Sequence, residues 1–412
     1  MKIAFDAKRA YQNATGLGNY SRTLISSLAT FYSEHQYFLC APKITDWFNT
    51  ASFSNIQNIT PQGFPSSALK SVWRSNWVKK DLLEKNINLY HGLSHEIPFG
   101  IDNTGIKSIV TIHDLIFERY PAQYNHLDVQ IYRHKFKHAC LHADTIIAIS
   151  KQTKDDIIQF YKTSEEKIII CYQSCHPAFA VEASVEEKSR VKELYNLPNQ
   201  FFLYVGSIIE RKNLLNICKA LHQLKNNLNI PLVVIGDGSK YKQQVRQYIK
   251  ENDLQKQVIF LLDSPSIKSL QSFQSVVNNP SIQSAKSEIQ SAKSAIQSAK
   301  SAIQSAIPII YQQALCLIYP SIYEGFGIPI LEALWSRLPV ITSHISCMPE
   351  TGGDAAYYVD PFSINEIAQA MLQVSNNNTL RQQMKEKGWK HAQKFTPQKC
   401  ADDVMQVYLR LQ

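Results

Sequence analysis

Two glutamates eight residues apart carry the strongest chemical signal in this chain. They lie in the segment 320–334 (PSIYEGFGIPILEAL), with Glu324 in a glycine-rich loop and Glu332 beyond Pro329. The pattern predicts a buried strand before the loop and a helix from Ile328, with Pro329 in the first turn, where a missing N–H is tolerated. A helix N-terminus aimed at such a loop favours anions. The segment therefore predicts a ligand with both phosphate and hydroxyl groups, as in a nucleotide-sugar.

A second segment, 204–213 (YVGSIIERKN), supplies positive charge. A predicted strand brings Gly206 to the edge of a sheet, and the adjacent cations Arg211 and Lys212 follow. Arginine offers a bidentate fork and lysine a point charge to the oxygens of a diphosphate leaving group when no metal is bound. A solvated cation pair on a loop is the alternative. The accompanying glutamate segment favours phosphate binding.

Together these segments resemble retaining GT-B glycosyltransferases of family 4, the glycosyl transferases group 1, whose E-x7-E motif matches Glu324 and Glu332. The Arg-Lys-Asn wording resembles mannosyltransferase-like members. The resemblance implies an α/β fold of two Rossmann-like domains, with parallel sheets facing an inter-domain cleft. It implies that Arg211 and Lys212 stabilise the departing diphosphate, that Glu324 holds sugar hydroxyls and that Glu332 contacts the ribose. The chain departs from the usual pattern at Ser207, where members commonly carry arginine.

Glycine-rich loops are the expected contacts of the donor. Gly236 and Gly238 follow a predicted strand and resemble the family's turn near the nucleotide, although a plain left-handed turn fits equally. The donor-binding residues implied by the resemblance are Gly206, Gly236, Gly325, Phe326, Gly327, Ile328 and Glu332.

Another glycine pair, Gly16 and Gly18, follows the first predicted strand and opens a helix. Taken alone it is a weak dinucleotide fingerprint, with Ser21 in place of the third glycine. An NAD site would also need an acidic residue at the end of the second strand, and that strand ends at Ala41 and Pro42. The dehydrogenase hypothesis therefore fails. The resemblance implies instead that the glycine loop faces the acceptor and can touch the donor phosphate.

A His-Asp pair, His113 and Asp114, follows the buried strand predicted at 108–112. An imidazole at the end of a strand can hydrogen-bond a sugar or an acceptor. A structural histidine is the alternative. The resemblance implies that His113 lies beside the transferred sugar. Asp114 is expected on the acceptor side, either orienting His113 or forming an unrelated cap.

Composition sets the broad class. The chain has 412 residues, an apolar fraction of 44%, a net charge of +9 and eight scattered cysteines. This length allows two full α/β domains, and the charge suits an anionic substrate, a membrane surface or a nucleic acid. No nucleic-acid motif accompanies it. The cysteines do not complete a zinc site, so we expect reduced thiols, no metal and no cofactor besides the nucleotide-sugar substrate, GDP-mannose or a UDP-hexose.

Strand and helix signals alternate along the chain and predict parallel sheets in both halves. The strands predicted in the first half are 2–6, 37–41, 89–90, 108–112, 145–149 and 167–171, and Ser150 is placed to cap a helix at 151–161. We expect an acceptor-side domain at 1–185, a nucleotide-sugar-binding domain at 186–385 and helices at 386–412 that cross back to the first domain. Residues 264–306 interrupt this pattern with a Ser/Gln/Ala/Lys-rich heptad repeat. A repeat expansion without chemistry is the favoured interpretation, and an interaction helix is the alternative. The insert leaves the wall around the nucleobase undetermined.

The cellular location of the protein is predicted from the absence of a signal peptide or membrane span in the sequence and from one aromatic and basic segment. The N-terminus reads as a strand rather than a signal peptide, and no apolar run reaches the ~18–20 residues of a membrane span. Segment 70–85 combines Trp73, Arg74 and Trp77 with lysines, which suits an anionic membrane surface. A solvated helix with two core tryptophans is the alternative. We expect a cytoplasmic protein, peripheral on the inner face of the plasma membrane.

The sequence thus favours a retaining, metal-independent hexosyltransferase. It is expected to move a hexose, by preference mannose, to a glycan or lipid-linked acceptor in cell-surface polysaccharide biosynthesis. Two rivals remain: a GT-B epimerase acting on a UDP-sugar, and a non-catalytic nucleotide-sugar-binding protein disabled by the repeat insert. The epimerase would need a set of cleft carboxylates and histidines, which fits the two motifs less well.

Overall fold

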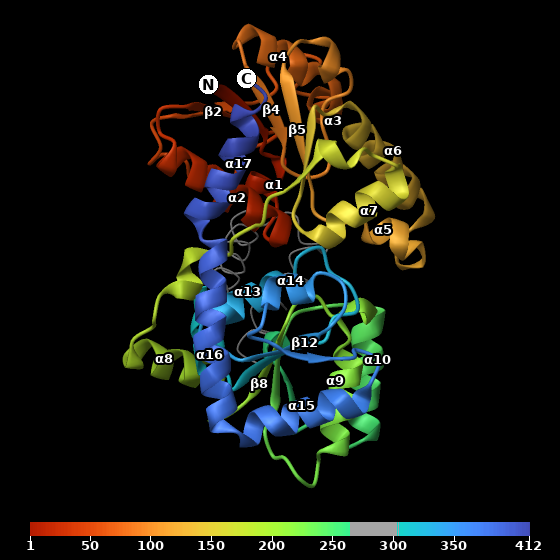
Figure 1. Cartoon of the computed structure of the whole chain (residues 1–412), viewed down its shortest axis with the longest axis vertical. Coiled ribbons are helices and arrows are strands. Elements are labelled where there is room, and N and C mark those ends of the chain that lie inside the picture. Colours follow the sequence, from red (N-terminus) through yellow and green to blue (C-terminus); the bar gives the residue numbers. More distant parts are fainter. Residues whose placement is uncertain (264–302, 304) are drawn as a thin grey trace, which may run out of the picture. The chain divides into compact units, whose positions relative to one another are not determined.

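The computed structural model describes residues 1–263, 303 and 305–412, which form two compact units (Figure 1). Unit 1 contains Met1–His176, Glu324–Ile328 and Gln393–Gln412, and unit 2 contains Pro177–Tyr323 and Pro329–Ala392. The repeat predicted at 264–306 lies outside the described residues, apart from 303, 305 and 306. Its role therefore stays a prediction.

Unit 1 is built on a parallel seven-stranded sheet with the order β3-β2-β1-β4-β5-β6-β7. The sequence pattern predicts all of these strands but β3, whose central residues Gln57 and Asn58 are polar and exposed. The strands are β1 (Lys2–Asp6), β2 (Gln36–Cys40), β3 (Ile56–Ile59), β4 (Leu89–Gly92), β5 (Lys107–Ile112), β6 (Thr145–Ala148) and β7 (Ile168–Ile170).

Helices cover both faces of this sheet (Figure 1). Along β1, Ile3 and Phe5 pack into the core formed with α2 and the C-terminal helix α17, whereas Ala4 packs into the core formed with α4, α6 and α7. Burial on both faces explains why the strands read as nearly continuous apolar runs. The helices of unit 1 are α1 (Lys8–Gln12), α2 (Gly16–Phe31), α3 (Lys70–Val72), the π-helical turn η1 (Trp73–Trp77), α4 (Val78–Glu84), α5 (Ile116–Arg119), α6 (His126–His142), α7 (Lys151–Tyr161) and α17 (Pro397–Leu409), with short 3-10 turns between them.

Two helix starts of unit 1 follow the capping signals in the sequence. Ser150 accepts a hydrogen bond from the backbone N–H of Thr153 and begins α7, as predicted. Thr396 caps α17 through the N–H of Lys399, and Pro397 occupies the first turn. In both cases the capping residue directly precedes the first residue of the helix.

Unit 2 contains a parallel six-stranded sheet with the order β10-β9-β8-β11-β12-β13. Its main core joins β8, β9, β11 and β12 to the helices α9, α10 and α15. The strands are β8 (Phe202–Val205), β9 (Leu232–Ile235), β10 (Val258–Phe260), β11 (Cys316–Tyr319), β12 (Val340–Ser343) and β13 (Tyr357–Val359). The helices are α8 (Val185–Tyr195), the 3-10 turn η6 (Glu210–Lys212), α9 (Leu214–Gln223), α10 (Lys240–Glu251), α13 (Ile328–Trp335), α14 (Met348–Gly352), α15 (Ile364–Asn376) and α16 (Asn378–Ala392).

Both sheets share one winding. Read from its third strand outward, each sheet runs 3-2-1-4-5-6 in its own chain order, which is the Rossmann order. The order reverses between β1 and β4 in unit 1 and between β8 and β11 in unit 2. Ligands of open α/β sheets bind outside the carboxyl ends of the strands at such switch points. The predicted fold class, two Rossmann-like α/β domains, is confirmed.

The segment predicted at 70–85 as a mixed aromatic and basic surface folds differently. The ring of Trp73 is 1% exposed and belongs to the core, and Trp77 packs against the same core. Arg74 points inward and pairs with Asp6 and Glu96. The structure thus supports the alternative of a helix with two core tryptophans.

Two further features of the fold concern the cysteines and the apolar character of the helices. All eight cysteines are free and buried. Within the described ranges, no helix is long and apolar enough to cross a bilayer.

Candidate functional site

The loops that follow β8 and β9 in unit 2 lie backbone against backbone. Gly206 N–H donates to the Ile235 carbonyl over 2.9 Å, and Ile208 N–H donates to the Asp237 carbonyl over 2.7 Å. A Cβ on Gly236 would lie 1.8 Å from the carbonyl oxygen of Gly206. Glycine at 236 is therefore required by the close approach of the two loops.

We expect Gly236→Ala to lower the free energy of unfolding by about 1–3 kcal/mol, because the new methyl group must push the Gly206 loop away. Urea unfolding measures the change. Gly16→Ala is the matched control, since a Cβ there meets nothing within 4 Å. Equal stability of the two variants would contradict the packing argument.

Lys212 lies at the β8/β11 switch point of unit 2. Its Nζ donates to the hydroxyl of Tyr319, the last residue of β11, over 2.5 Å. Gly206, with φ +140°, lies so close that a Cβ would come within 3.1 Å of Nζ. Lys212 thus lies beside the predicted glycine turn at Gly206, where a phosphate group would meet both a positive charge and backbone that no side chain covers.

Arg211 points inward. Its side chain is buried, its guanidinium donates to the Tyr323 carbonyl, and its own carbonyl accepts from Ile322 N–H at 2.8 Å and from Ser321 Oγ at 3.1 Å. The neighbouring Asn213 donates to the carbonyl of Pro320 over 3.1 Å. Arg211 therefore supports the loop that leads to Glu324, a contact that the sequence pattern does not predict.

Glu332 lies in α13 and accepts a hydrogen bond from the Tyr311 hydroxyl at 2.9 Å. Burial raises the pKa of Glu332 to about 7, although the Tyr311 hydrogen bond and the charge of Lys212 act in the opposite direction. Lys212 is thus in electrostatic range of Glu332. Sequence reasoning missed Tyr311, because it follows directly on the repeat insert and carries no motif.

This carboxyl predicts a pH-dependent stability. With a folded-state pKa near 7 and an unfolded value of about 4.3, the folded protein holds the extra proton between these values. The stability that protonated Glu332 contributes to the folded state is fully present below the unfolded pKa, and it is lost as pH rises through the folded pKa. Glu332→Gln should therefore gain about 1–3 kcal/mol relative to wild type between about pH 5 and about pH 8. Urea unfolding across this range measures it. Glu386→Gln on the exposed side of α16 should keep the wild-type slope, and an unchanged slope in Glu332→Gln would contradict the assignment.

In unit 1, the loop Glu324–Ile328 packs against the residues that follow β5 and β6. A Cβ on Gly325 would lie 2.1 Å from the His113 carbonyl oxygen, and the Gly325 carbonyl accepts from Ser150 Oγ at 2.6 Å. Thr153 Oγ1 donates to the His113 carbonyl over 3.1 Å. Glu324 itself is 9% exposed. The structure thus brings the Glu324 loop and His113 together within unit 1.

The rest of this loop is shaped by packing. The Phe326 ring is buried and contacts the rings of Tyr172 and Phe395, with centroid distances of 6.0 Å and 5.7 Å. Gly327 has φ +87°, which disfavours any side chain, and Ile328 begins α13. The ring of Phe326 is therefore engaged in packing within unit 1.

His113 is buried and neutral. Its Nε2 donates to the Leu93 carbonyl over 2.9 Å, and the edge of the Tyr20 ring packs at a centroid distance of 4.6 Å. Burial lowers the pKa of His113 to about 4. Because Nε2 carries the proton, Nδ1 is the acceptor of this imidazole. The adjacent Asp114 accepts from the N–H of Ile116 at 3.1 Å and so helps to begin α5.

The glycine pair near the N-terminus is tightly built. A Cβ on Gly18 would lie 1.8 Å from the Asn13 carbonyl oxygen, whereas Gly16 has open space around it. The side chain of Asn13 accepts from the N–H groups of Thr15 and Gly18 at 2.9 and 3.2 Å. Gly18 is thus needed for the turn, and Gly16 begins α2 with room for a ligand.

Within the residues that the structure describes, no group of three or more His, Cys, Asp or Glu side chains could hold a metal ion. The predicted site residues fall into two groups. Unit 2 holds Gly206, Lys212 and Glu332, and unit 1 holds Gly16, Gly18, His113 and Glu324.

Family models and curated relatives identify the family of this chain. The model described as "Glycosyl transferases group 1" matches residues 185–283 and 282–391, and "Glycosyltransferase Family 4" matches 14–175. O-antigen chain mannosyltransferase B of Escherichia coli is 22% identical, over 99% of each chain. O-antigen chain mannosyltransferase RfbU of Salmonella typhimurium is 24% identical, over 86% of this chain and 85% of its own length.

Solved structures support the fold. Anabaena Alr3699/HepE in complex with UDP and glucose superposes with a TM-score of 0.69 at 14% identity, over 100% of both chains. This likeness confirms the predicted GT-B fold. The sequence matches show further that the protein is a glycosyltransferase of polysaccharide biosynthesis, and the chain belongs to the glycosyl transferases group 1 family.

Proposed function

We propose that this glycosyltransferase moves a hexose, by preference mannose from GDP-mannose, with retention at the anomeric carbon and without a metal ion. The acceptor is a glycan or a lipid-linked glycan of a cell-surface polysaccharide. Support for mannose comes from the Arg-Lys-Asn segment and from the names of the two O-antigen relatives. A UDP-hexose is the second candidate donor, because the Anabaena structure was solved with UDP and glucose.

The observation that carries the proposal is the grouping of Lys212, Gly206 and Glu332 in unit 2. Lys212 lies next to the open backbone of Gly206 and within electrostatic range of Glu332. A diphosphate needs the cation, and a ribose needs a hydrogen-bonding carboxyl. We assign Lys212 to the diphosphate and Glu332 to the ribose. Arg211 contributes mainly by supporting the loop before Glu324.

Unit 1 supplies the groups assigned to the sugar and the acceptor. Glu324 holds sugar hydroxyls, and the neutral His113 accepts a hydrogen bond at Nδ1. Gly16, Gly18 and Asp114 line the acceptor side. In the proposed reaction the acceptor oxygen attacks the anomeric carbon on the face from which the diphosphate departs. The bond from the anomeric carbon to the phosphate oxygen breaks, and the departing phosphate takes the acceptor proton.

We place the enzyme in the cytoplasm, peripheral on the inner face of the plasma membrane, where a lipid-linked acceptor would be presented. The net charge of +9 supports attraction to an anionic surface. Association with vesicles containing about one-third anionic lipid, lost at high salt, is the corresponding measurement.

The test is release of free nucleoside diphosphate by the wild-type protein from a panel of GDP- and UDP-sugars, with and without a chelator. Slow hydrolysis in the absence of acceptor reveals the donor. Release from GDP-mannose alone, unaffected by the chelator, is expected. Binding without release from any donor would favour the non-catalytic alternative, and no nucleotide binding at all would overturn the proposal.

A further inference from the structure

Two adjacent cations, Lys8 and Arg9, follow the first strand of unit 1. Lys8 and Arg9 come directly after the carboxyl end of β1, and both residues are partly buried. With the residues that the structure describes, neither side chain forms an ion pair or a hydrogen bond. Partly desolvated cations usually have an anionic partner, and a bound anionic ligand would supply one to this pair.

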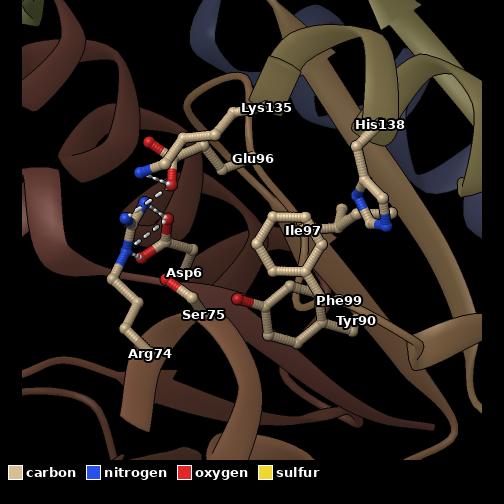
Figure 2. Close-up of a pocket in the computed structure, with 9 residues that line it drawn as sticks. All are labelled: Asp6, Arg74, Ser75, Tyr90, Glu96, Ile97, Phe99, Lys135 and His138. Carbon is tan, nitrogen blue, oxygen red and sulfur yellow. Dashed lines mark hydrogen bonds and ion pairs between the residues drawn. The ribbon is translucent and has the colours of Figure 1, made fainter. Parts of the chain in front are cut away.

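Two carboxylates that act on Lys8, Asp6 and Glu96, form ion pairs with other cations. Asp6, at the end of β1, accepts hydrogen bonds from both Nε and Nη2 of Arg74, and Nε lies 3.0 and 3.1 Å from its two carboxylate oxygens. Glu96 accepts from Arg74 at 2.8 Å and from Lys135 at 3.1 Å. Figure 2 shows this closed network, in which two acids meet two cations. Asp6 and Glu96 attract Lys8 electrostatically, but the ion pairs that they form in this network are with Arg74 and Lys135.

Arg9 acts electrostatically on two histidines of unit 1, His95 and His113. The pKa of Lys8 is lowered first by burial and then by the positive charges of Arg74 and Arg9, which together outweigh the opposite effects of Glu96 and Asp6. The charge of Arg9 also lowers the pKa of His95 and His113, after the larger effect of burial. Arg9 is therefore in electrostatic range of His113, and the region as a whole carries excess positive charge.

The sheet topology locates Lys8 and Arg9 at the β1/β4 switch point of unit 1. Phe5 of β1 lies opposite His91 of β4, and β4 pairs in turn with β5, which leads to His113. Lys8 and Arg9 thus follow the strand on one side of the β1/β4 switch point. In unit 2, the corresponding switch point carries Gly206 and Lys212. Because ligands of open α/β sheets bind at such points, an anion at Lys8 and Arg9 fits the architecture.

We propose that Lys8 and Arg9 bind an oxyanion group of the acceptor at the β1/β4 switch point of unit 1. The inference rests on the proposed transferase function, and it adds that the acceptor is charged. Arginine and lysine together match a phosphate or diphosphate, as a lipid-linked glycan carries, and also match the carboxylate of an acidic sugar. The donor diphosphate is assigned separately to Lys212.

The test is calorimetric binding of two probes to the full chain, farnesyl diphosphate and glucuronate, in saturating GDP or UDP so that the donor diphosphate site is filled. Wild type is expected to bind a probe, and the double variant Lys8→Gln with Arg9→Gln should bind it at least tenfold more weakly. Binding of farnesyl diphosphate alone identifies a phosphate-bearing acceptor, and binding of glucuronate alone identifies an acidic sugar.

Three controls make the result decisive. Lys43→Gln, an exposed lysine of unit 1, should leave binding unchanged, and the charge-conserving exchange Lys8→Arg with Arg9→Lys should restore it. Thermal unfolding of the double variant checks its fold, and the two single variants replace it if it is unstable. Failure of wild type to bind either probe, or equal binding by the double variant, would overturn the inference. Failure of nucleotide binding would instead count against the proposed function.

Discussion

Replacing Glu324 with glutamine is expected to lower kcat/KM for donor turnover by about 10²–10³-fold. Glu324 is only 9% exposed, and its neighbour Gly325 is fixed against His113 and Ser150, so the carboxylate has little freedom to move. A carboxylate held in place stabilises the positive charge that develops at an anomeric carbon, whereas an amide of the same shape does not. Initial rates of nucleoside diphosphate release measure the loss.

Comparison of variants separates charge from shape. Glu324→Ala should lose at least as much activity as Glu324→Gln, since it also removes the hydrogen bonds to sugar hydroxyls. Glu386→Gln, on an exposed position of α16, should keep wild-type rates. A fall of less than fivefold in Glu324→Gln, with unchanged thermal unfolding, would remove Glu324 from the proposed machinery.

Local patterns in the sequence predict much of this fold. The strand predicted at Lys2–Asp6 and the helix predicted at Lys151–Tyr161 correspond residue for residue to β1 and α7, because a buried parallel strand leaves an apolar run and a capped amphipathic helix leaves a periodic signal. Strand β3 is missed because it has too few apolar residues to be distinguished from a loop. The alternation of strands and helices predicted parallel sheets in both halves, and the family resemblance implied the two Rossmann-like domains.

Direction of side chains is harder to predict. Arg74 and Arg211 both read as solvent-facing or ligand-facing cations, yet each is buried against a partner that lies far away in the sequence. Such contacts depend on how the chain returns, here to Asp6 at the end of β1 and to the Tyr323 carbonyl after β11. Sequence spacing carries no information about these long-range pairs.

The glycines show the reverse case. Gly18, Gly236 and Gly325 were chosen from motif spacing, and each has a close backbone contact that a Cβ would not allow. A motif therefore marks where two backbone segments meet, even when it does not reveal which side chain reaches the ligand. His113 was likewise placed correctly at the end of a buried strand, but its neutral state depends on burial that only the fold provides.

Lys212→Gln is expected to lower the rate of nucleoside diphosphate release by about 10²–10³-fold. Lys212 is the cation beside Gly206, and its Nζ donates to the hydroxyl of Tyr319, 2.5 Å away, which holds it at the end of β11. A departing diphosphate gains negative charge in the transition state, so a fixed cation stabilises it more than it stabilises the bound donor. The loss should therefore fall mainly on kcat rather than on KM.

Three variants distinguish this role from simple support of the loop. Lys212→Arg keeps the charge and should recover part of the rate, whereas Tyr319→Phe removes only the hydroxyl contact and should cost less than tenfold. Lys256→Gln, an exposed lysine of unit 2, should leave the rate unchanged. If Lys212→Gln raised KM with kcat intact, Lys212 would bind donor and transition state equally, and the positive charge that drives departure of the diphosphate would have to come from elsewhere, with Arg211 as the next residue to replace.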